Sequence, residues 1–326
     1  MSSENSSSEK LNWVEKQFRM KELGTNVKKE TLAGITTFVS MAYILFVNPS
    51  VLGASGMDKG AVFTATALSA ILGCLLMAFL ANYPIAIAPG LGDNAFFTYS
   101  VVLAMGIKWQ TALAGVVVAS IIFTILTFFK IREIVINAIP HNLKLAMAAG
   151  IGMFIAFIGL QGGGLVVASK SSLVQLGSLT VPTTWLTIFG LFVTALLMAR
   201  KVPGSIFIGI VATAILGLVT GLIKAPSQIV SSIPSMKPTF AVGIKHLGDV
   251  NTPQMWAVVL IFLLVAFFDT AGTLIGLAQQ AGLMKNDKMP RIGQALMADS
   301  VSMLAGSVMG TTPTAAYVES SAGIAV

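Results

Sequence analysis

The stretch MWAVVLIFLLVAFFDTAGTLIGLA, from Met255 to Ala278, is long enough to cross a bilayer and holds one acid, Asp269, near its middle. A charged side chain at membrane depth costs between ~3 and more than ~10 kcal/mol, so such residues face a cavity, a partner or a substrate. We therefore interpret Asp269 as functional. A structural alternative is that Asp269 caps a half-helix beginning at Thr270, because Asp before Thr-Ala-Gly is an N-cap signal. Capping and a functional role can coexist.

The composition is that of a membrane protein. Of the 326 residues, 55% are hydrophobic and 10% are charged, and the mean hydropathy is +0.86, whereas soluble domains carry about 25% charged residues. Cys74 is the only cysteine and lies in an apolar run, and the histidines are His141 and His246. We therefore expect no disulfide framework, no metal site and no cofactor. The net charge of +7 is spread over short loops, so we expect no nucleic-acid partner.

Apolar runs that fit transmembrane helices recur along the chain. The predicted spans cover residues 31–51, 61–81, 109–129, 145–167, 185–199, 206–223, 255–278 and 293–308. None of these spans contains Lys or Arg. Residues 1–10 are polar and lack the apolar core of a signal peptide, and residues 11–29 read as an interfacial helix. Residues 130–144 read as a basic amphipathic connector that contains Arg132, and residues 224–253 as the only long loop.

The distribution of basic residues predicts the orientation in the membrane. Fourteen of the 20 Lys and Arg residues fall on the side of the predicted spans where the N-terminus lies, and six fall on the other side. Because loops rich in Lys and Arg stay inside, we expect a multi-pass protein of the cell membrane with a cytoplasmic N-terminus.

Two apolar segments are interrupted in a way that a continuous helix cannot accommodate. Residues 84–106 contain the sequence APGLG, which predicts a short extended piece at residues 85–89 and a half-helix from about Asn94. Residues 311–318 alternate like a short strand, and a half-helix can begin at Glu319. The two segments lie about 220 positions apart. Paired broken segments of this kind are typical of transporters built from inverted repeats, with the site between them.

Four stretches of the chain resemble the AzgA-like permeases for adenine, guanine and hypoxanthine, a branch of the nucleobase/cation symporters in the nucleobase-ascorbate transporter superfamily. The matching stretches are GITTFVSMAYILFVNP (Gly34–Pro49), APGLGDNAFF (Ala88–Phe97), FDTAGTL (Phe268–Leu274) and YVESSAG (Tyr317–Gly323). They occur in the family's order and span nearly the whole chain. The resemblance implies a secondary active transporter that imports purine nucleobases by proton symport, and not an enzyme.

The resemblance also implies an all-α fold of fourteen transmembrane segments in two inverted repeats of seven, with short strands and half-helices at segments 3 and 10. On this pattern the chain ends in the tenth segment, so we expect a fragment that lacks segments 11–14. The expected parts are an N-terminal tail with an interfacial helix (1–30), a core domain (31–130 and 254–326), a gate domain (131–225) and an extracellular loop (226–253). Relatives often dimerise through the gate domain, so a homodimer of the full-length protein is expected.

The resemblance places the family's two site acids on Asp269 and Glu319. Both would bind the base, because a buried carboxylate accepts hydrogen bonds from ring N–H groups. Asp269 is expected to carry the coupling proton and Glu319 to anchor the base, although the two can share these roles. Asn94 matches a substrate-contacting asparagine, with a half-helix N-cap as its alternative.

Four other residues of these segments are also assigned. Main-chain groups near Tyr317 and Val318 are expected to complete the hydrogen bonding of the base, and Thr273, one turn after Asp269, to face the same cavity. Asp299 is interpreted as structural, bonding broken backbone near segment 10, with a substrate ligand as its alternative because acids inside the membrane are usually functional. Asp93 stands where the family usually has an apolar residue.

Three rival functions remain in view. The main alternative is an anion or sulfate-type exchanger of the same inverted fold, which would be expected to have a cationic or neutral site where Glu319 stands. An intramembrane enzyme is disfavoured because the chain has no His-Glu-x-x-His and no Gly-x-Ser-x-Gly motif. A channel is disfavoured because two broken segments with acids suit an occluded site better than an open pore.

Overall fold

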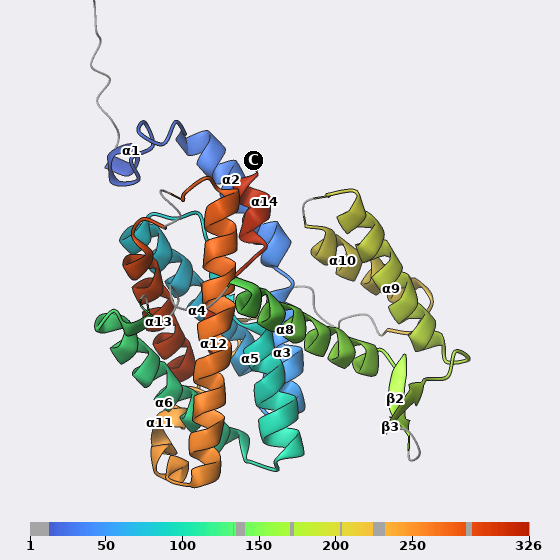
Figure 1. The fold of residues 1–326 in the computed structure, drawn as a ribbon. Helices are drawn as coiled ribbons and strands as arrows, with labels where there is room; N and C mark the ends of the chain where they lie inside the picture. The colour runs from blue at the N-terminus through green and yellow to red at the C-terminus, as the bar shows by residue number, and fades with distance from the viewer. Residues whose placement is uncertain are drawn as a thin grey trace, which may run out of the picture.

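A computed structural model gives the fold (Figure 1) and describes residues 13–132, 134, 141–169, 173–202, 204–223, 232–284 and 289–325. Within this part of the chain, five helices are long and apolar enough to cross a membrane. They are Val27–Ala54, Lys59–Ala81, Trp109–Phe128, Pro182–Ala199 and Pro253–Gln280. Each overlaps a span predicted from hydropathy, so the protein is a multi-pass membrane protein.

The first predicted span consists of two helical pieces. Helix α2 (Val27–Met41) begins after Asn26, whose side chain accepts the backbone N–H of Lys29 at 2.9 Å. The chain turns at Ala42 and Tyr43 before α3 (Ile44–Ala54). This turn gives Tyr43 a position at the interruption of the span.

The N-terminal interfacial helix differs from the expectation. Among the described residues, helix α1 covers only Trp13–Gln17, and turns and extended chain fill residues 18–26 before α2 begins. Arg19 has a positive φ of 52°, a conformation that ends a helix. The prediction of one helix over residues 11–29 is therefore wrong, and its first two residues lie outside the described part.

The second predicted span forms helix α4 (Lys59–Leu76), which continues as the π-helical turn η1 (Met77–Ala81). Asp58 caps α4 by accepting the N–H of Ala61 at 2.7 Å. Asn82, in the left-handed conformation, ends the helix, and Pro84 follows before the first strand.

The two broken segments meet as an antiparallel pair of short strands. Strand β1 (Ile87–Pro89) pairs with β4 (Thr314–Ala316) in the register Ile87↔Ala316, Ala88↔Ala315 and Pro89↔Thr314. After β1 come α5 (Leu91–Ala95) and the π-helical segment η2 (Phe96–Ala104), and after β4 comes α14 (Ser320–Ile324). The strand expected over residues 311–318 is thus shorter at both ends.

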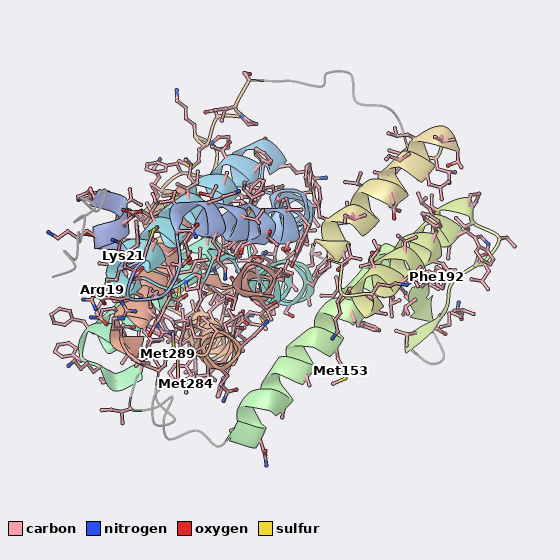
Figure 2. All side chains as sticks on the ribbon, turned by 90° about the horizontal axis from the view of Figure 1, so that it is seen from above. Arg19, Lys21, Met153, Phe192, Met284 and Met289 are labelled. Carbon is pink, nitrogen blue, oxygen red and sulfur yellow. The ribbon has the colours of Figure 1, made fainter. Side chains whose placement is uncertain are left out.

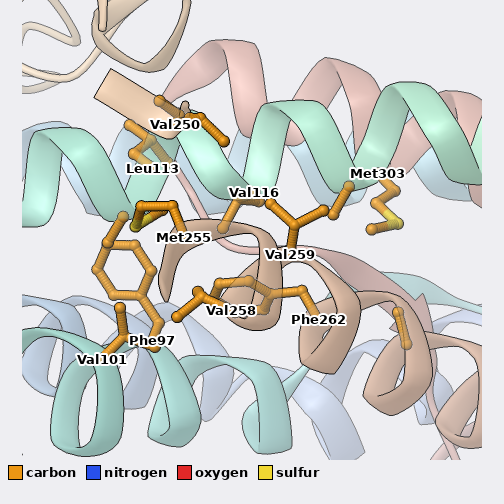
Figure 3. Packing of buried hydrophobic residues seen from close by; sticks show 14 of the residues in the cluster. Phe97, Val101, Leu113, Val116, Val250, Met255, Val258, Val259, Phe262 and Met303 are labelled. Atoms are coloured by element: carbon orange, nitrogen blue, oxygen red, sulfur yellow. The ribbon is translucent and has the colours of Figure 1, made fainter. Parts of the chain in front are cut away.

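The main apolar core lies between α6 (Trp109–Phe128), α12 (Pro253–Gln280) and η2. Figure 3 shows Phe262 and Val259 of α12 beside Phe97 and Val116 in this cluster. Helix α13 (Ile292–Met309) packs against both α6 and α4 and contributes Met303 to the core. The strand pair is buried and packs against α4, α12 and α13.

A second group of helices stands to one side of this core, as seen from above in Figure 2, which labels Met153 and Phe192 on it. It consists of α8 (His141–Gly162), α9 (Pro182–Ala199) and α10 (Ser205–Val219), with a hairpin of β2 (Val166–Ser169) and β3 (Leu173–Leu176). The hairpin was not predicted. The span expected to reach Val167 ends at Gly162, since Gly163 and Gly164 follow and the chain turns there.

The predicted long loop contains two short helices in its described part, α11 (Val242–Lys245) and the 3₁₀ helix η3 (Leu247–Val250), and both pack on α6. Val250 is buried and joins the main core. The region is therefore not a plain loop, because one end of it covers the helix that lines the core.

Candidate functional site

The strand pair is held at both ends by additional backbone hydrogen bonds. Gly90 N–H donates to Pro313 O at 2.8 Å, and Tyr317 N–H donates to Ala86 O at 2.9 Å. Strand β1 contacts α4, while β4 contacts α12 and α13. A β-carbon on Gly73 of α4 would lie 2.8 Å from Ile87 Cγ2, so glycine at this position permits the close approach of strand and helix.

Asp269 lies within α12, which runs unbroken from Pro253 to Gln280. The alternative in which Asp269 caps a half-helix beginning at Thr270 is therefore wrong. The Asp269 carboxylate faces Gly90 at the end of β1, since a β-carbon built there would lie 3.4 Å from Asp269 Oδ2. No donor among the described residues reaches this carboxylate, which leaves it available for another partner.

Glu319 directly precedes α14 and is partly exposed. Its Oε1 accepts a hydrogen bond from the Tyr43 hydroxyl at 2.5 Å, and Tyr43 is buried. The next residue, Ser320, accepts the Ala86 N–H at 2.9 Å. Glu319 is thus fixed against the interruption between α2 and α3. Its second carboxylate oxygen has no protein partner in the described part.

The backbone around Tyr317 differs from what we expected. The Tyr317 N–H donates to Ala86 O, and its hydroxyl donates to Pro89 O at 2.5 Å. Tyr317 therefore joins the two strands and has no free main-chain donor. Val318 is 63% exposed. The N–H groups of Val318 and Glu319 donate to no acceptor among the described residues. These two groups are the free donors beside the Glu319 carboxylate.

Asn94 lies inside α5, whose N-cap is Gly90, so the N-cap alternative for Asn94 is wrong. Its side-chain oxygen accepts a hydrogen bond from Thr312, next to β4. Its side-chain amide nitrogen is buried without an acceptor in the described part. Asn94 therefore connects the two broken segments. Thr273 lies one turn after Asp269 on α12 and is half-buried.

The structure corrects the expected surroundings of Asp299. Arg132 was assigned to a basic connector, yet both side chains are fully buried and form an ion pair of 3.2 Å. Thr270 of α12 also donates to Asp299, at 3.1 Å. Arg132 donates to Ser300 Oγ at 2.7 Å and lies over the Phe123 ring. Asp299 thus bonds side chains of α12 and of the residues after α6, and not broken backbone near residue 310.

A second buried polar group escaped the sequence interpretation. Asn48 of α3 donates to Thr66 of α4 at 2.7 Å and to Thr311 at 2.9 Å. All three side chains are fully buried. Asn48 stands directly before Pro49, so its sequence signal was read only as the end of a span.

An apolar cavity of about 450 Å³ lies beside the strand pair and is lined by α2, α3, α4 and residues 83–86. Cys74 lines it, and its sulfur lies 3.5 Å from Ile87 N. Neither Asp269 nor Glu319 lines this cavity. Among the described residues, no three His, Cys, Asp or Glu side chains cluster closely enough to hold a metal ion.

The arrangement combines two carboxylates with free accepting oxygens, Asp269 and Glu319, with free main-chain donors at Val318 and Glu319. Such a set suits a ligand that has both N–H donors and acceptors on its edge.

Comparison with known proteins gives the following matches. The model of a family described as "Permease family" matches residues 28–326. Guanine/hypoxanthine permease PbuG of Bacillus subtilis is 53% identical over 317 residues, which cover 94% of this chain and 72% of PbuG. Adenine permease AdeP of Escherichia coli is 41% identical over 314 residues, covering 96% of this chain and 70% of AdeP.

Among solved structures, the transmembrane domain of a cyanobacterium bicarbonate transporter, BicA, matches with a TM-score of 0.61. The match covers 92% of this chain and 77% of the BicA chain at 15% identity. At this identity the likeness concerns the fold alone, which is therefore a helical membrane-transporter fold.

Proposed function

The chain belongs to the permease family whose model matches residues 28–326, and we propose on that premise that it imports purine nucleobases such as guanine, hypoxanthine and adenine. Its relatives PbuG and AdeP carry the names of guanine/hypoxanthine and adenine permeases. It is a transporter and not an enzyme. The observation that carries the proposal is the placement of Asp269 and Glu319 at the two ends of the β1–β4 pair.

Glu319 is the proposed anchor of the base. A purine presents ring N–H donors and ring-nitrogen acceptors along one edge, and a carboxylate beside free main-chain N–H groups matches both. Tyr43 occupies one Glu319 oxygen and fixes its orientation, so the other oxygen and the N–H groups of Val318 and Glu319 face the base. Bases with the wrong pattern would leave the carboxylate unpaired, which gives selectivity.

The remaining site residues surround this anchor in the proposal. Asp269 accepts from the far side of the base, and Thr273 lies one turn along α12 from it. Asn94 acts through its free amide nitrogen, while its oxygen is held by Thr312. Tyr317 keeps the two strands in register beneath the base.

We assign proton symport to Asp269. It is half-buried in an apolar helix and has no basic partner within the described residues, so its ionised form is costly and proton uptake removes the cost. A proton taken from outside and released inside would then accompany each base. The N-terminus would be cytoplasmic and the membrane would be the cell membrane, as the distribution of Lys and Arg predicts.

The proposed architecture is two inverted repeats of seven segments, with residues 31–130 and 254–326 in a core domain and residues 131–225 in a gate domain. The pairing of two similar broken segments, β1–α5 and β4–α14, supports it. Residues 1–30 and 226–253 remain a tail and an extracellular loop in this scheme. A homodimer would form through the gate domain.

An anion exchanger of the same fold is less well supported. Two carboxylates lie at the ends of the strand pair, and Arg132, the buried cation of the described part, is already paired with Asp299. An anion would therefore meet repulsion at the site.

Uptake of radiolabelled hypoxanthine, guanine, adenine and uracil in cells without their own permeases tests the function. The chain is expressed both as it stands and continued by the remaining residues of PbuG, with and without a proton uncoupler. Uncoupler-sensitive uptake of purines but not uracil is expected. Purine uptake that is unchanged by the uncoupler would refute proton symport. Uptake of sulfate without uptake of purines would refute the proposed import of purine nucleobases.

Three variants assign the roles. Glu319→Gln is expected to raise the KM for purines at least tenfold, because loss of a charge-assisted hydrogen bond removes about 1.5–3 kcal/mol. Asp269→Asn is expected to abolish accumulation against a gradient while exchange of base across the membrane persists. Asp249→Asn changes an exposed acid and serves as the matched control.

A further inference from the structure

Asp93 is an acid that the proposed transport cycle leaves without a role. It lies in the first turn of α5, and its side chain is fully buried. Neither of its carboxylate oxygens has a hydrogen-bond partner among the described residues. A buried polar group without a partner costs roughly 1–3 kcal/mol, and more if it is charged. Asp93 therefore calls for a chemical explanation.

Asp93 and Asp269 face the same small space. A β-carbon built on Gly90 would lie 3.1 Å from Asp93 Oδ2, 3.4 Å from Asp269 Oδ2 and 3.5 Å from the β-carbon of Ala315. A β-carbon at position 90 would be a tight contact for the Asp93 oxygen and an ordinary contact for the Asp269 oxygen, so glycine leaves the most room beside both. The two carboxylates come from segments that are far apart in sequence, α5 and α12, which contact each other.

No positive charge offsets this pair in the described part of the chain. Helix α5 is packed against α3, η2, α8 and α12. Helix α3 has no titratable residue, η2 has Tyr99, and α12 has Asp269. Helix α8 carries His141 and Lys144, both near its N-terminal end.

Beyond these neighbours, Glu319 acts electrostatically on Asp269, and Asp299 acts electrostatically on both carboxylates. Its charge is offset by Arg132 at 3.2 Å. Two carboxylates that share a small space without a cation between them resist ionising together, because each charge opposes the other and Asp93 is fully buried.

We propose that Asp93 and Asp269 form one protonation unit that shares a single proton. The proton resides on an oxygen of one carboxylate, which then donates to the other, so the pair carries one negative charge. The unit takes up or releases one proton as an O–H bond to a carboxylate oxygen forms or breaks, with water as donor or acceptor. For transport, this role rests on the proposed proton symport, in which Asp93 becomes the second half of the coupling site.

Infrared spectroscopy of the purified chain tests the shared proton without any substrate. At neutral pH a protonated carboxyl group gives a C=O stretching band, and it shifts in heavy water. If one proton is shared, Asp93→Asn and Asp269→Asn each abolish the same band, and Asp249→Asn leaves it unchanged. If the two variants remove different bands, or if Asp93→Asn removes none, the shared proton is refuted.

The second readout is the pH dependence of purine uptake. Acids that interact strongly titrate together, so removing one moves the pH midpoint of uptake by about one unit or more. Asp93→Asn is expected to show this shift and the Asp249→Asn control none. A wild-type midpoint in Asp93→Asn would overturn the coupling role. If the wild-type chain takes up no purine in either form, the proposed function fails, and the infrared result still decides the shared proton.

Two further variants keep the test decisive if Asp93→Asn does not fold. Gly90→Ala places a methyl group 3.1 Å from Asp93 Oδ2 and 3.4 Å from Asp269 Oδ2, and the φ of −71° at Gly90 suits alanine. It is expected to split the shared band into the signals of two separate groups. Asp93→Leu replaces the buried acid, which has no hydrogen-bond partner in the described part, by an apolar side chain, and it is expected to lose the band while folding normally. An unchanged band in both variants would refute the proposal.

Discussion

Breaking the buried ion pair between Arg132 and Asp299 is expected to destabilise the protein strongly. Both side chains are fully buried, and their charged atoms lie 3.2 Å apart. Arg132→Met leaves the Asp299 carboxylate with Thr270 as its one donor in the described part. Asp299→Leu leaves the Arg132 guanidinium bonded only to uncharged oxygens, such as Ser300 Oγ. Removing one partner of a buried pair costs about 3–5 kcal/mol, because the remaining charge is uncompensated.

The double variant Arg132→Met/Asp299→Leu is expected to recover most of that loss. Replacing a whole buried pair by apolar residues of similar volume is often neutral or stabilising by about 1–4 kcal/mol. Some loss remains, because Arg132 also packs 3.6 Å from the centre of the Phe123 ring. The double variant therefore separates the energy of an uncompensated charge from the energy of lost packing.

Thermal unfolding in detergent, followed by tryptophan fluorescence, measures these effects. At about 2–4 °C per kcal/mol, each single variant should lower the Tm by roughly 10 °C. Arg200→Met, which changes an exposed arginine, is the matched control and should leave the Tm unchanged. The reasoning is refuted if either single variant unfolds within about 2 °C of the wild type, or if the double variant is as unstable as the sum of the singles.

Three further predictions concern the surroundings of the site. Tyr43→Phe keeps the ring but removes the hydroxyl that donates to Glu319 at 2.5 Å. The KM for purines should therefore rise about tenfold with little change in Tm. An unchanged KM would contradict the role of Tyr43 in positioning Glu319. Alkylation of Cys74 by a maleimide should block purine uptake, because the Cys74 sulfur lies 3.5 Å from the backbone N of Ile87 in β1. Uptake by the Cys74→Ala variant should not respond to the maleimide. Full uptake by the alkylated protein would show that β1 tolerates the added bulk. Hydrogen bonds from His246 and Thr111 lower the pKa of the Asp249 carboxyl. A carboxyl whose pKa is lower in the folded state adds stability above the free value of about 3.9 and loses it as pH falls through the folded value. Asp249→Asn should therefore unfold at a slightly lower temperature than wild type at pH 7, with no difference at strongly acidic pH; a difference that grows on acidification would have the wrong sign.

The membrane class and the positions of five long helices could be predicted from the sequence. Each depends on a continuous apolar run, such as residues 109–129 for the helix Trp109–Phe128. The broken segment at Pro89 and Gly90 was equally readable, because proline and glycine act on their own backbone. Such signals are local, so no knowledge of distant residues is needed.

The errors at helix ends have local causes that hydropathy does not register. The chain turns at Gly163 and Gly164, yet the apolar residues of strand β2 follow and extend the apolar run to Val167. Hydropathy also does not register the interruption between α2 and α3 at Tyr43, because the residues at the interruption are themselves apolar.

The sequence alone determined which residues carry unusual chemistry inside the membrane, namely Asp93, Asp269, Asp299 and Glu319, since an acid in an apolar run is visible without a structure. Only the tertiary structure decided their partners. Arg132 reaches Asp299 from 167 positions away, and Tyr43 reaches Glu319 from 276. These pairs depend on how each helix is rotated and on which helices are neighbours, and no local pattern records either quantity. The acids could therefore be identified from the sequence. Only the three-dimensional structure showed that Asp299 is paired with Arg132, that Glu319 is held by Tyr43, and that Asp93 and Asp269 face the same space.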